Sequence, residues 1–233
     1  MDVLVVDVGG SHIKLLASGA TEPRRFESSA DLTPAKMIER VRELTADWSY
    51  DLVSIGYPGE VAGDGPAAEP GSLGPGWVGF DFERALGKPV RLVNDAVMQA
   101  LGGYDGGRML FIGLGTGLGS ALVIEHVVVP LELGRLPYLD GRTMVEHVGR
   151  AALEEHGERA WQEAVRDITE RLRLAFSADY VLLGGGNAQL VKPLPRDARR
   201  GGNEDAFSGG FRLWEETIEP HDREPARVWR VLR

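Results

Sequence analysis

The sequence contains no cysteine among its 233 residues. Disulfide bonds are therefore excluded, and so is any zinc site that depends on thiolate ligands. Long apolar runs are also missing, and the N-terminus has neither the basic segment nor the cleavage site of a signal peptide. We therefore expect a cytoplasmic protein that makes no contact with a membrane.

Positive charge is scarce as well. Lysine and arginine number 26 against 35 aspartates and glutamates, which gives a net charge of -9 and argues against nucleic acid as a partner. Residues 196–200 (R-D-A-R-R) form a short basic stretch of mixed charge, which we interpret as a solvated loop. With 43% apolar and 26% charged residues the chain can bury a core, and its length suits one large domain or two small ones.

Glycine, in contrast, is abundant, with 31 residues, four of them in Gly113–Ser120 (G-L-G-T-G-L-G-S). A dinucleotide-binding loop would need the spacing G-x-G-x-x-G and a helix directly after it. The third glycine of that spacing would fall on Leu118 or Ser120, and the following S-A-L-V-I-E-H-V-V-V is typical of a strand. The pattern therefore predicts a strand, a glycine turn and a second strand, and the dinucleotide interpretation fails.

The same arrangement of strand, turn and strand occurs twice. It is found at residues 3–18 (V-L-V-V-D-V-G-G-S-H-I-K-L-L-A-S) and again at residues 109–124 (M-L-F-I-G-L-G-T-G-L-G-S-A-L-V-I). Two such hairpins, each opening a half with helices and further strands, predict a duplicated α/β fold with a cleft between the halves. The alternative is that apolar hairpins recur by chance.

Two of the glycine turns are suited to phosphate, because glycines allow backbone N–H groups to approach an anion closely. The first is D-V-G-G-S-H-I-K, where Ser11 adds a hydroxyl, Lys14 a positive charge, and Asp7 a carboxylate able to hold Mg²⁺ through water. The second is the loop in which Thr116 stands between two glycines. The alternative for each is an ordinary tight turn.

Two further segments could serve the same cleft. Asp95 ends the V-N-D motif where a predicted strand meets a predicted helix, and an acid held there can take a proton from a substrate hydroxyl. An aspartate in this position is more often a helix N-cap. L-L-G-G-G-N at residues 182–187 forms a loop without side chains that could accept a flat base.

In their order, these segments resemble the ROK family of sugar kinases, within the actin/hexokinase/Hsp70 superfamily. The resemblance rests on D-V-G-G-S-x-I-K, Y-P-G, V-N-D-A, I-G-L-G-T-G-L-G-S-A-L, L-E-L-G and L-G-G-G, from Val3 to about Trp214. It is closest to the polyphosphate glucokinase branch, through G-G-S-x-I-K, the cysteine-free segment after L-E-L-G and the later V-G-R-A-A-L-E-E-H-G-E-R-A-W. The resemblance implies a duplicated actin-like (ribonuclease H-like) α/β fold, with an N-terminal lobe at residues 1–97, a C-terminal lobe at residues 98–233 and a central cleft.

The resemblance also implies roles for single residues. Asp95 would be the general base that deprotonates a hexose hydroxyl, with Asn94 and Glu132 as sugar ligands and Asp7 as the carboxylate that associates with Mg²⁺ through water. The residues implied to bind phosphate or nucleotide are Gly9, Gly10, Ser11 and Lys14 in the first loop, Gly115, Thr116, Gly117 and Gly119 in the second, and Gly184, Gly185 and Gly186 in an adenosine loop.

The sequence departs from the family pattern at two positions, both on the sugar side. The motif E-x-G-H reads E-L-G-R, so Arg135 replaces a histidine, and Ser72 stands where an asparagine is frequent. Arginine can donate to sugar hydroxyls but is permanently charged and cannot accept a hydrogen bond. We still expect both residues in the substrate site, with a preference shifted toward a sugar that carries an anionic group.

The function expected from this resemblance is a glucokinase-like transfer of a phosphoryl group from ATP or polyphosphate to a hexose hydroxyl, with Mg²⁺ and without zinc. Its partners would be the sugar and the donor, with a possible homodimer. One alternative is a sugar- or nucleotide-binding regulatory protein, and another is a kinase for a non-glucose acceptor. The intact Asp95 favours an enzyme. Because the sequence starts at the first phosphate strand, we also do not expect a repressor with the DNA-binding segment of ROK repressors.

Overall fold

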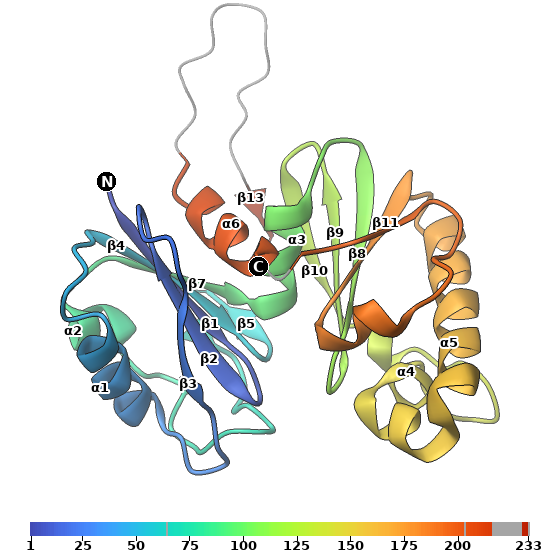
Figure 1. Cartoon of the computed structure of the whole chain (residues 1–233), viewed down its shortest axis with the longest axis horizontal. Coiled ribbons are helices and arrows are strands. Elements are labelled where there is room, and N and C mark those ends of the chain that lie inside the picture. Colours follow the sequence, from blue (N-terminus) through green and yellow to red (C-terminus); the bar gives the residue numbers. More distant parts are fainter. Residues whose placement is uncertain (64, 203, 216–229, 233) are drawn as a thin grey trace, which may run out of the picture.

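The computed structural model describes residues 1–63, 65–202, 204–215 and 230–232. It has two lobes, each built on a mixed β-sheet with helices on its outer side, and two further helices lie between the sheets (Figure 1). The expected α/β fold with two lobes is therefore confirmed. No helix among these residues is both long and apolar enough to span a bilayer.

The N-terminal sheet has the strand order β3-β2-β1-β4-β7. Its strands are β1 (Val3–Val8), β2 (His12–Ala17), β3 (Arg24–Glu27), β4 (Leu52–Tyr57) and β7 (Val90–Asn94). β1 pairs antiparallel with β2 and parallel with β4. A small two-stranded sheet, β5 (Val61–Ala62) and β6 (Gly65–Pro66), lies in the connection that follows β4.

Helices α1 (Pro34–Leu44) and α2 (Phe82–Leu86) cover the outer face of this sheet. α1 begins as the sequence indicates, because the Thr33 side chain accepts a hydrogen bond from the N–H of Lys36 and Pro34 occupies the first turn. The residues buried on one side of the helix are Pro34, Met37, Ile38 and Val41. Met37, Ile38 and Val41 pack into a core cluster with Leu4, Val6 and Val8 of β1.

The C-terminal sheet repeats the first. Its strands are β8 (Arg108–Leu114), β9 (Leu118–Ile124), β10 (Val127–Leu131), β11 (Tyr180–Gly184), β12 (Ala198–Arg200) and β13 (Arg230–Val231). In the order β10-β9-β8-β11-β12 they match β3-β2-β1-β4-β7 in position and direction, and β13 adds to the edge. The two hairpins recognised in the sequence are thus the first two strands of each half, and the duplication is confirmed.

The outer face of the C-terminal sheet is covered by α5 (Arg150–Ala175), preceded by the short helix α4 (Val145–Val148). An apolar stripe on α5 is buried, with Trp161, Val165, Ile168 and Leu172 in the core. Short 3-10 helices follow β10 (Leu133–Arg135) and β11 (Gly186–Leu190). Residues 198–200, interpreted from the sequence as a loop, instead form strand β12.

A central core joins the lobes through α3 (Asp95–Gly103) and α6 (Asp205–Arg212), which lie between the two sheets (Figure 1). Glycines bring these helices into backbone contact. A Cβ atom at Gly102 would lie 1.8 Å from the carbonyl oxygen of Asp205, and one at Gly209 would lie 1.7 Å from that of Met98. The helices can therefore approach this closely only without side chains at these points.

Helix α6 also docks on the N-terminal sheet. The Ser54 hydroxyl of β4 donates to the carbonyl oxygen of Gly210 at 2.6 Å and accepts from the Trp214 indole at 2.9 Å. The lobe boundary expected at residue 97 falls inside α3, and α6 contacts the N-terminal lobe although it comes from the C-terminal half. The precise division of the chain stays a prediction.

The first prediction concerns the contact between α3 and α6. Gly209→Ala would gain about 1 kcal/mol of helix propensity but would force a methyl group onto the Met98 carbonyl, and such overpacking costs about 1–3 kcal/mol or more. We expect a net loss of unfolding free energy in urea. The control is Ser208→Ala at the adjacent exposed position of α6. Equal stability of the two variants would contradict the packing argument.

Candidate active site

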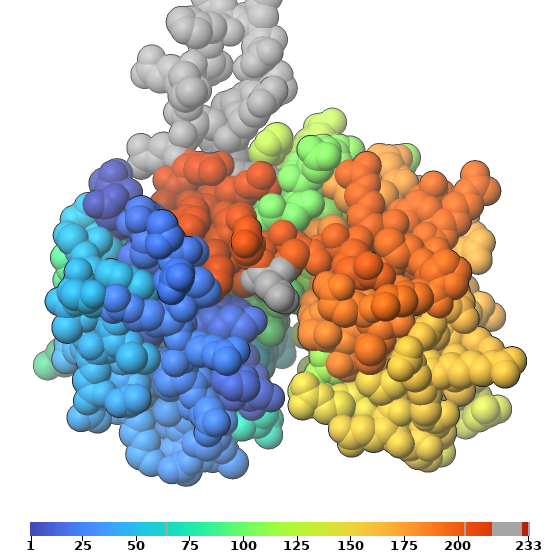
Figure 2. Space-filling view, in the orientation of Figure 1, coloured from blue at the N-terminus to red at the C-terminus, as the bar shows by residue number. Residues whose placement is uncertain are grey.

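The candidate site lies at the carboxyl ends of β1, β7 and β8, where the lobes face each other. Val3 and Val5 of β1 belong to the central core, and because side chains alternate along a strand, Asp7 points to the same side. On this side a groove separates the lobes in the space-filling view (Figure 2). The groove thus corresponds to the cleft expected between the two halves.

The first glycine loop, residues 9–11, is a tight turn between β1 and β2. The N–H of Gly9 donates to the carbonyl oxygen of His12 at 3.1 Å, and a Cβ at Gly9 would lie 2.8 Å from that oxygen, so the turn requires glycine. The Ser28 hydroxyl donates to the Gly9 carbonyl at 2.8 Å. Gly10 and Ser11 are left exposed, as a loop that receives an anion requires.

Asp7 and Lys14 face each other across β1 and β2. The Lys14 ammonium lies 3.6 Å from the Asp7 carboxylate, and the side chains are 42% and 10% exposed. Burial raises the pKa of Asp7, and the positive charge of Lys14 opposes this shift. Asp7 is therefore a buried acid with one cationic neighbour, and Lys14 keeps enough exposure to reach a ligand.

Asp95 is the first residue of α3, but it does not cap the helix. That role belongs to Asn94, whose side-chain oxygen accepts from the N–H of Ala96 at 2.9 Å and of Val97 at 3.3 Å. Asn94 also donates to the carbonyl oxygen of Gly59 at 2.9 Å. The Asn94 oxygen is thus occupied by the helix, and its role as a sugar ligand stays a prediction.

The environment of Asp95 shifts its protonation. Burial and the negative charge of Asp7, with a smaller effect of Glu132, raise the pKa of Asp95 to about 7. The N–H of Ala96, which donates to the carboxylate at 2.8 Å, acts in the opposite direction. Asp95 remains partly solvent-accessible, so the groove contains an acid that changes protonation near neutral pH and can be reached by a ligand.

The second glycine loop, residues 115–117, connects β8 and β9 and rests on the beginning of α5. The N–H of Gly115 donates to the Gly117 carbonyl at 3.2 Å, and the N–H of Arg150 donates to the Gly115 carbonyl at 3.1 Å. Thr116 and Gly117 are exposed. The backbone of the loop is therefore held by the start of α5, and its tip is exposed.

Gly119 and Gly184 have a packing role that the sequence interpretation did not include. A Cβ at Gly119 would lie 2.9 Å from the Cβ of Ala96, and one at Gly184 would lie 3.3 Å from the Gln99 amide oxygen and closer still to the Phe111 ring. Gly119 therefore admits helix α3 next to Asp95, whereas Gly184 makes room chiefly for the Phe111 ring. Their roles as phosphate and adenosine ligands stay predictions.

The other glycines of the third loop differ from each other. Gly185 has φ +79, and a Cβ there would lie 2.5 Å from the Leu114 carbonyl oxygen, so this position requires glycine for backbone reasons. Gly186 faces open space and begins the short helix that follows β11. Of the three predicted adenosine-loop residues, Gly186 is the one that leaves room for a ligand.

Glu132 and Arg135 lie on one short helical turn, both exposed. The Arg135 Nε atom is 3.7 Å from a Glu132 carboxylate oxygen. Ser72 lies elsewhere, with its hydroxyl 3.1 Å from where a Cβ of Gly10 would stand, beside the first glycine loop. The two departures from the family motif are therefore separated: Arg135 adjoins the predicted sugar ligand, and Ser72 adjoins the predicted phosphate loop.

Sequence reasoning missed one residue that shapes the loop carrying Ser72. The Glu69 carboxylate accepts hydrogen bonds from the N–H groups of Gly76, Trp77 and Val78, at 3.0, 3.1 and 3.2 Å. The Glu69 carboxylate thereby accepts hydrogen bonds from three successive backbone N–H groups and fixes the turn at residues 76–78. No spacing in the sequence predicts these hydrogen bonds, because they depend on how the loop folds back.

The residues around Asp7 can be tested for their fit to Mg²⁺. This ion is typically held by one or two carboxylates, with water and substrate phosphates completing its coordination. Asp7 at the first glycine loop suits this mode. No group of three or more acidic or histidine side chains that could hold a metal is found in the described part of the chain. The residues therefore fit a Mg²⁺ ion that binds together with a substrate phosphate. Protein side chains of the described residues alone would not complete its coordination.

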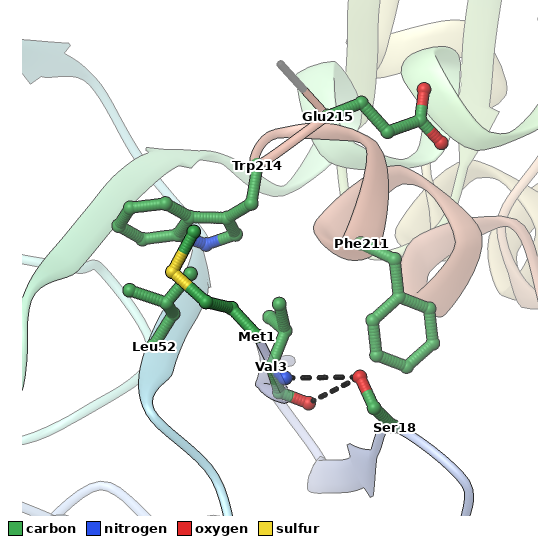
Figure 3. Close-up of a pocket in the computed structure, with 7 residues that line it drawn as sticks. All are labelled: Met1, Val3, Ser18, Leu52, Phe211, Trp214 and Glu215. Carbon is green, nitrogen blue, oxygen red and sulfur yellow. Dashed lines mark hydrogen bonds between the residues drawn. The ribbon is translucent and has the colours of Figure 1, made fainter.

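A separate hollow lies at the opposite end of the N-terminal sheet. It is lined by Met1, Leu52, Phe211 and Trp214, with Val3 at its base (Figure 3). Val3 begins β1, whereas Asp7 lies near its carboxyl end. This hollow is therefore not part of the candidate site.

The chain matches no protein-family model. Two curated proteins are similar in sequence. The bifunctional enzyme NanE/NanK of Brucella melitensis biotype 1 is 31% identical over 138 residues, which are 52% of this chain and 26% of that protein. Kanosamine kinase of Amycolatopsis mediterranei is 31% identical over 164 residues, which are 63% of this chain and 53% of that protein. The matched regions thus span about a quarter and about half of these relatives.

Solved structures agree over more of the chain. The inorganic polyphosphate/ATP-glucomannokinase of Arthrobacter sp. strain KM has a TM-score of 0.78 at 24% identity, covering 90% of this chain and 96% of that one. A ROK family transcriptional regulator has a TM-score of 0.67 at 14% identity, covering 90% and 76%. At these identities the likeness shows the fold, and this fold serves both a kinase and a regulator.

The chain has a duplicated, two-lobed α/β fold, shared with the glucomannokinase structure, and a titratable acid and two glycine loops lie at its groove. More closely, it resembles the ROK family sugar kinases, and the resemblance expected from its motifs is confirmed.

The raised pKa of Asp95 leads to a prediction about stability. The folded protein keeps the Asp95 proton up to about pH 7 while the unfolded chain releases it near pH 4, so ionisation destabilises the folded state as pH rises through this window. Asp95→Asn removes the charge and keeps an oxygen for the Ala96 N–H. We expect it to raise the melting temperature at about pH 8 and to have little effect near pH 4.

The control is Asp179→Asn, because the Arg108 guanidinium lowers the pKa of Asp179. This exposed carboxylate stabilises the fold in its charged form, so its loss has the opposite sign: a decrease at about pH 8 that disappears on acidification. Two variants that respond to pH in the same direction would rule out the assignment of Asp95 as a buried, repelled acid.

Proposed function

We propose that the protein is a sugar kinase of the ROK type, which transfers a phosphoryl group to a hexose hydroxyl. The observation that carries the proposal is the environment of Asp95, an acid with a pKa of about 7 at the start of α3. A general base works best with a pKa near the operating pH. The sequence similarity to kanosamine kinase and to NanE/NanK supports a sugar as the acceptor.

In this mechanism Asp95 accepts the proton of the attacking hydroxyl, whose oxygen forms a bond to the terminal phosphorus of the donor. The P–O bond on the opposite side of that phosphorus breaks, and ADP or the shortened polyphosphate leaves with the bonding electrons. Phosphoryl transfer depends mainly on positioning and on stabilising charge. The N–H groups of the two glycine loops and the Lys14 ammonium would hold the phosphates. Mg²⁺ supplies charge neutralisation on the phosphate oxygens, and Asp7 would hold it through water.

The acceptor would lie between Asp95 and the turn that carries Glu132 and Arg135. Carboxylate and guanidinium groups on one turn offer both an acceptor and a donor to sugar hydroxyls. The proposed donor is ATP or polyphosphate. The structural likeness to a glucomannokinase that is named for both donors supports both alternatives. We propose that the acceptor can be a sugar other than glucose, because neither of the two sequence relatives is named for glucose.

A regulatory protein that binds a sugar or nucleotide is the second candidate, and the fold shared with a transcriptional regulator is the observation in its favour. Such a protein has no need of a base, whereas here burial and a neighbouring carboxylate tune an acid to neutrality. We therefore favour the kinase. A homodimer and a cytoplasmic location remain predictions.

The central test is phosphoryl transfer by the purified protein with Mg²⁺, a panel of neutral, amino and anionic sugars, and ATP or polyphosphate in parallel. Asp95→Asn should lower kcat by a factor of about 10² to 10⁴. With the wild-type protein, kcat/KM for the sugar should fall as pH drops below about 7, because the base becomes protonated. Sugar binding without turnover for any pair would favour the regulatory candidate.

Arg135→His tests the expected sugar preference. If Arg135 recognises an anionic group, the histidine variant should lose efficiency with anionic sugars by about tenfold, a usual value for one charged hydrogen bond. Neutral sugars should be affected less. An unchanged order of preference across the panel would show that the exposed Arg135 does not select the substrate.

A further inference from the structure

Two neighbouring residues of β9, Gly119 and Ser120, point to opposite faces of the C-terminal sheet. Ala121 and Val123 belong to the central core, so Gly119, two residues before Ala121, faces α3 and the groove. Ser120 faces the other way and is 2% exposed. Its paired residue on β10 is Leu131, the last residue of that strand.

The Ser120 hydroxyl continues the sheet where the strand pairing ends. It donates to the carbonyl oxygen of Leu131 at 2.9 Å and accepts from the N–H of Leu133 at 3.1 Å. Both contacts flank Glu132, the residue between them. The Glu132 carbonyl in turn accepts from the N–H of Arg135 at 3.1 Å. The backbone is therefore fixed on both sides of Glu132, although the Glu132 side chain itself is exposed.

Gly119, the neighbour of Ser120, packs against the first turn of α3, which carries Asp95. The absent side chain at Gly119 admits Ala96, whose neighbour is Asp95. Consecutive residues of one strand thus contact the helix turn that carries Asp95 and the chain segment that carries Glu132. A rigid strand sets distances better than a loop does, because its backbone is held by the sheet on both sides.

We propose that Ser120 is a positioning residue, which holds Glu132 at a fixed separation from Asp95 so that a bound sugar presents its hydroxyl to the base. This inference rests on the proposed function, with Glu132 as a sugar ligand. Ser120 touches no substrate. Its effect is on the free energy of binding, because an unfixed Glu132 must be ordered when the sugar binds.

The chain offers a matched control in Ser54. This serine is also fully buried and its hydroxyl also bridges two partners, the Gly210 carbonyl and the Trp214 indole. It lies at the α6 contact, away from Glu132. Removing either hydroxyl leaves buried polar groups without a partner and lowers stability. Only Ser120 should also affect the sugar.

The experiment compares Ser120→Ala, Ser120→Thr and Ser54→Ala in the full chain. Two quantities are measured: hydrogen exchange of the Leu133 amide, and steady-state kinetics with the best sugar and donor of the wild-type protein. For Ser120→Ala we expect faster Leu133 exchange and an increase of about tenfold in KM for the sugar, with kcat and the KM for the donor changed far less. Ser120→Thr keeps the hydroxyl and should restore both values toward wild type.

Two results would overturn the inference. The first is Leu133 exchange that is unchanged in Ser120→Ala. The second is an equal rise of the sugar KM in Ser54→Ala, which would mark a general effect of lower stability. If the wild-type protein phosphorylates no sugar, the proposed function fails on that result alone. Leu133 exchange then still decides whether Ser120 fixes the segment, and calorimetric sugar binding replaces KM, with absent binding counting against the positioning role.

Discussion

Close packing of α3 against α6 joins the two lobes in a central core. Backbone atoms of the two helices meet at Gly102 and Gly209, and α6 is tied to the N-terminal sheet through the Ser54 hydroxyl. Helix α3 is thereby held between the two sheets. Because Asp95 is its first residue, the acid has a fixed place relative to both glycine loops. The two duplicated lobes are thus joined by α3 and α6, and the candidate site lies between them.

The same packing sets the electrostatics of the groove. It buries Asp7 and places it close enough to Asp95 to raise the pKa of the second acid, while Lys14 offsets part of the cost at the first. Two neighbouring carboxylates destabilise a fold when both are charged. This pair of acids distinguishes the groove from the hollow at the other end of the sheet.

Local signals explain what could be predicted from the sequence. The two hairpins, the start of α1 at Thr33 and Pro34, and the apolar stripe of α5 all follow from patterns within a few turns or strand pairs. Asp95 could be located at a strand–helix junction for the same reason. Contacts between distant segments had no such signal. Ser54 and Gly210, for example, are 156 positions apart. Glu69 lies only 7 to 9 positions from its partners, but that contact depends on how an irregular loop folds back and follows no periodic pattern.

Local patterns in the sequence predict the duplicated α/β fold, the glycine turns and the position of Asp95. Strand alternation, turn residues and helix caps carry this information because each depends only on neighbouring residues. The role of each glycine could not be predicted in this way. The space left by a missing side chain can hold either a phosphate or a packed helix, and the residues that surround the glycine in the folded protein determine which of the two it is. The tertiary structure brings Ala96 against Gly119 and Gln99 against Gly184, and it joins Ser120 to both sides of Glu132. The first two contacts depend on α3 packing against the C-terminal sheet, and the Ser120 contacts form when the β9–β10 hairpin closes.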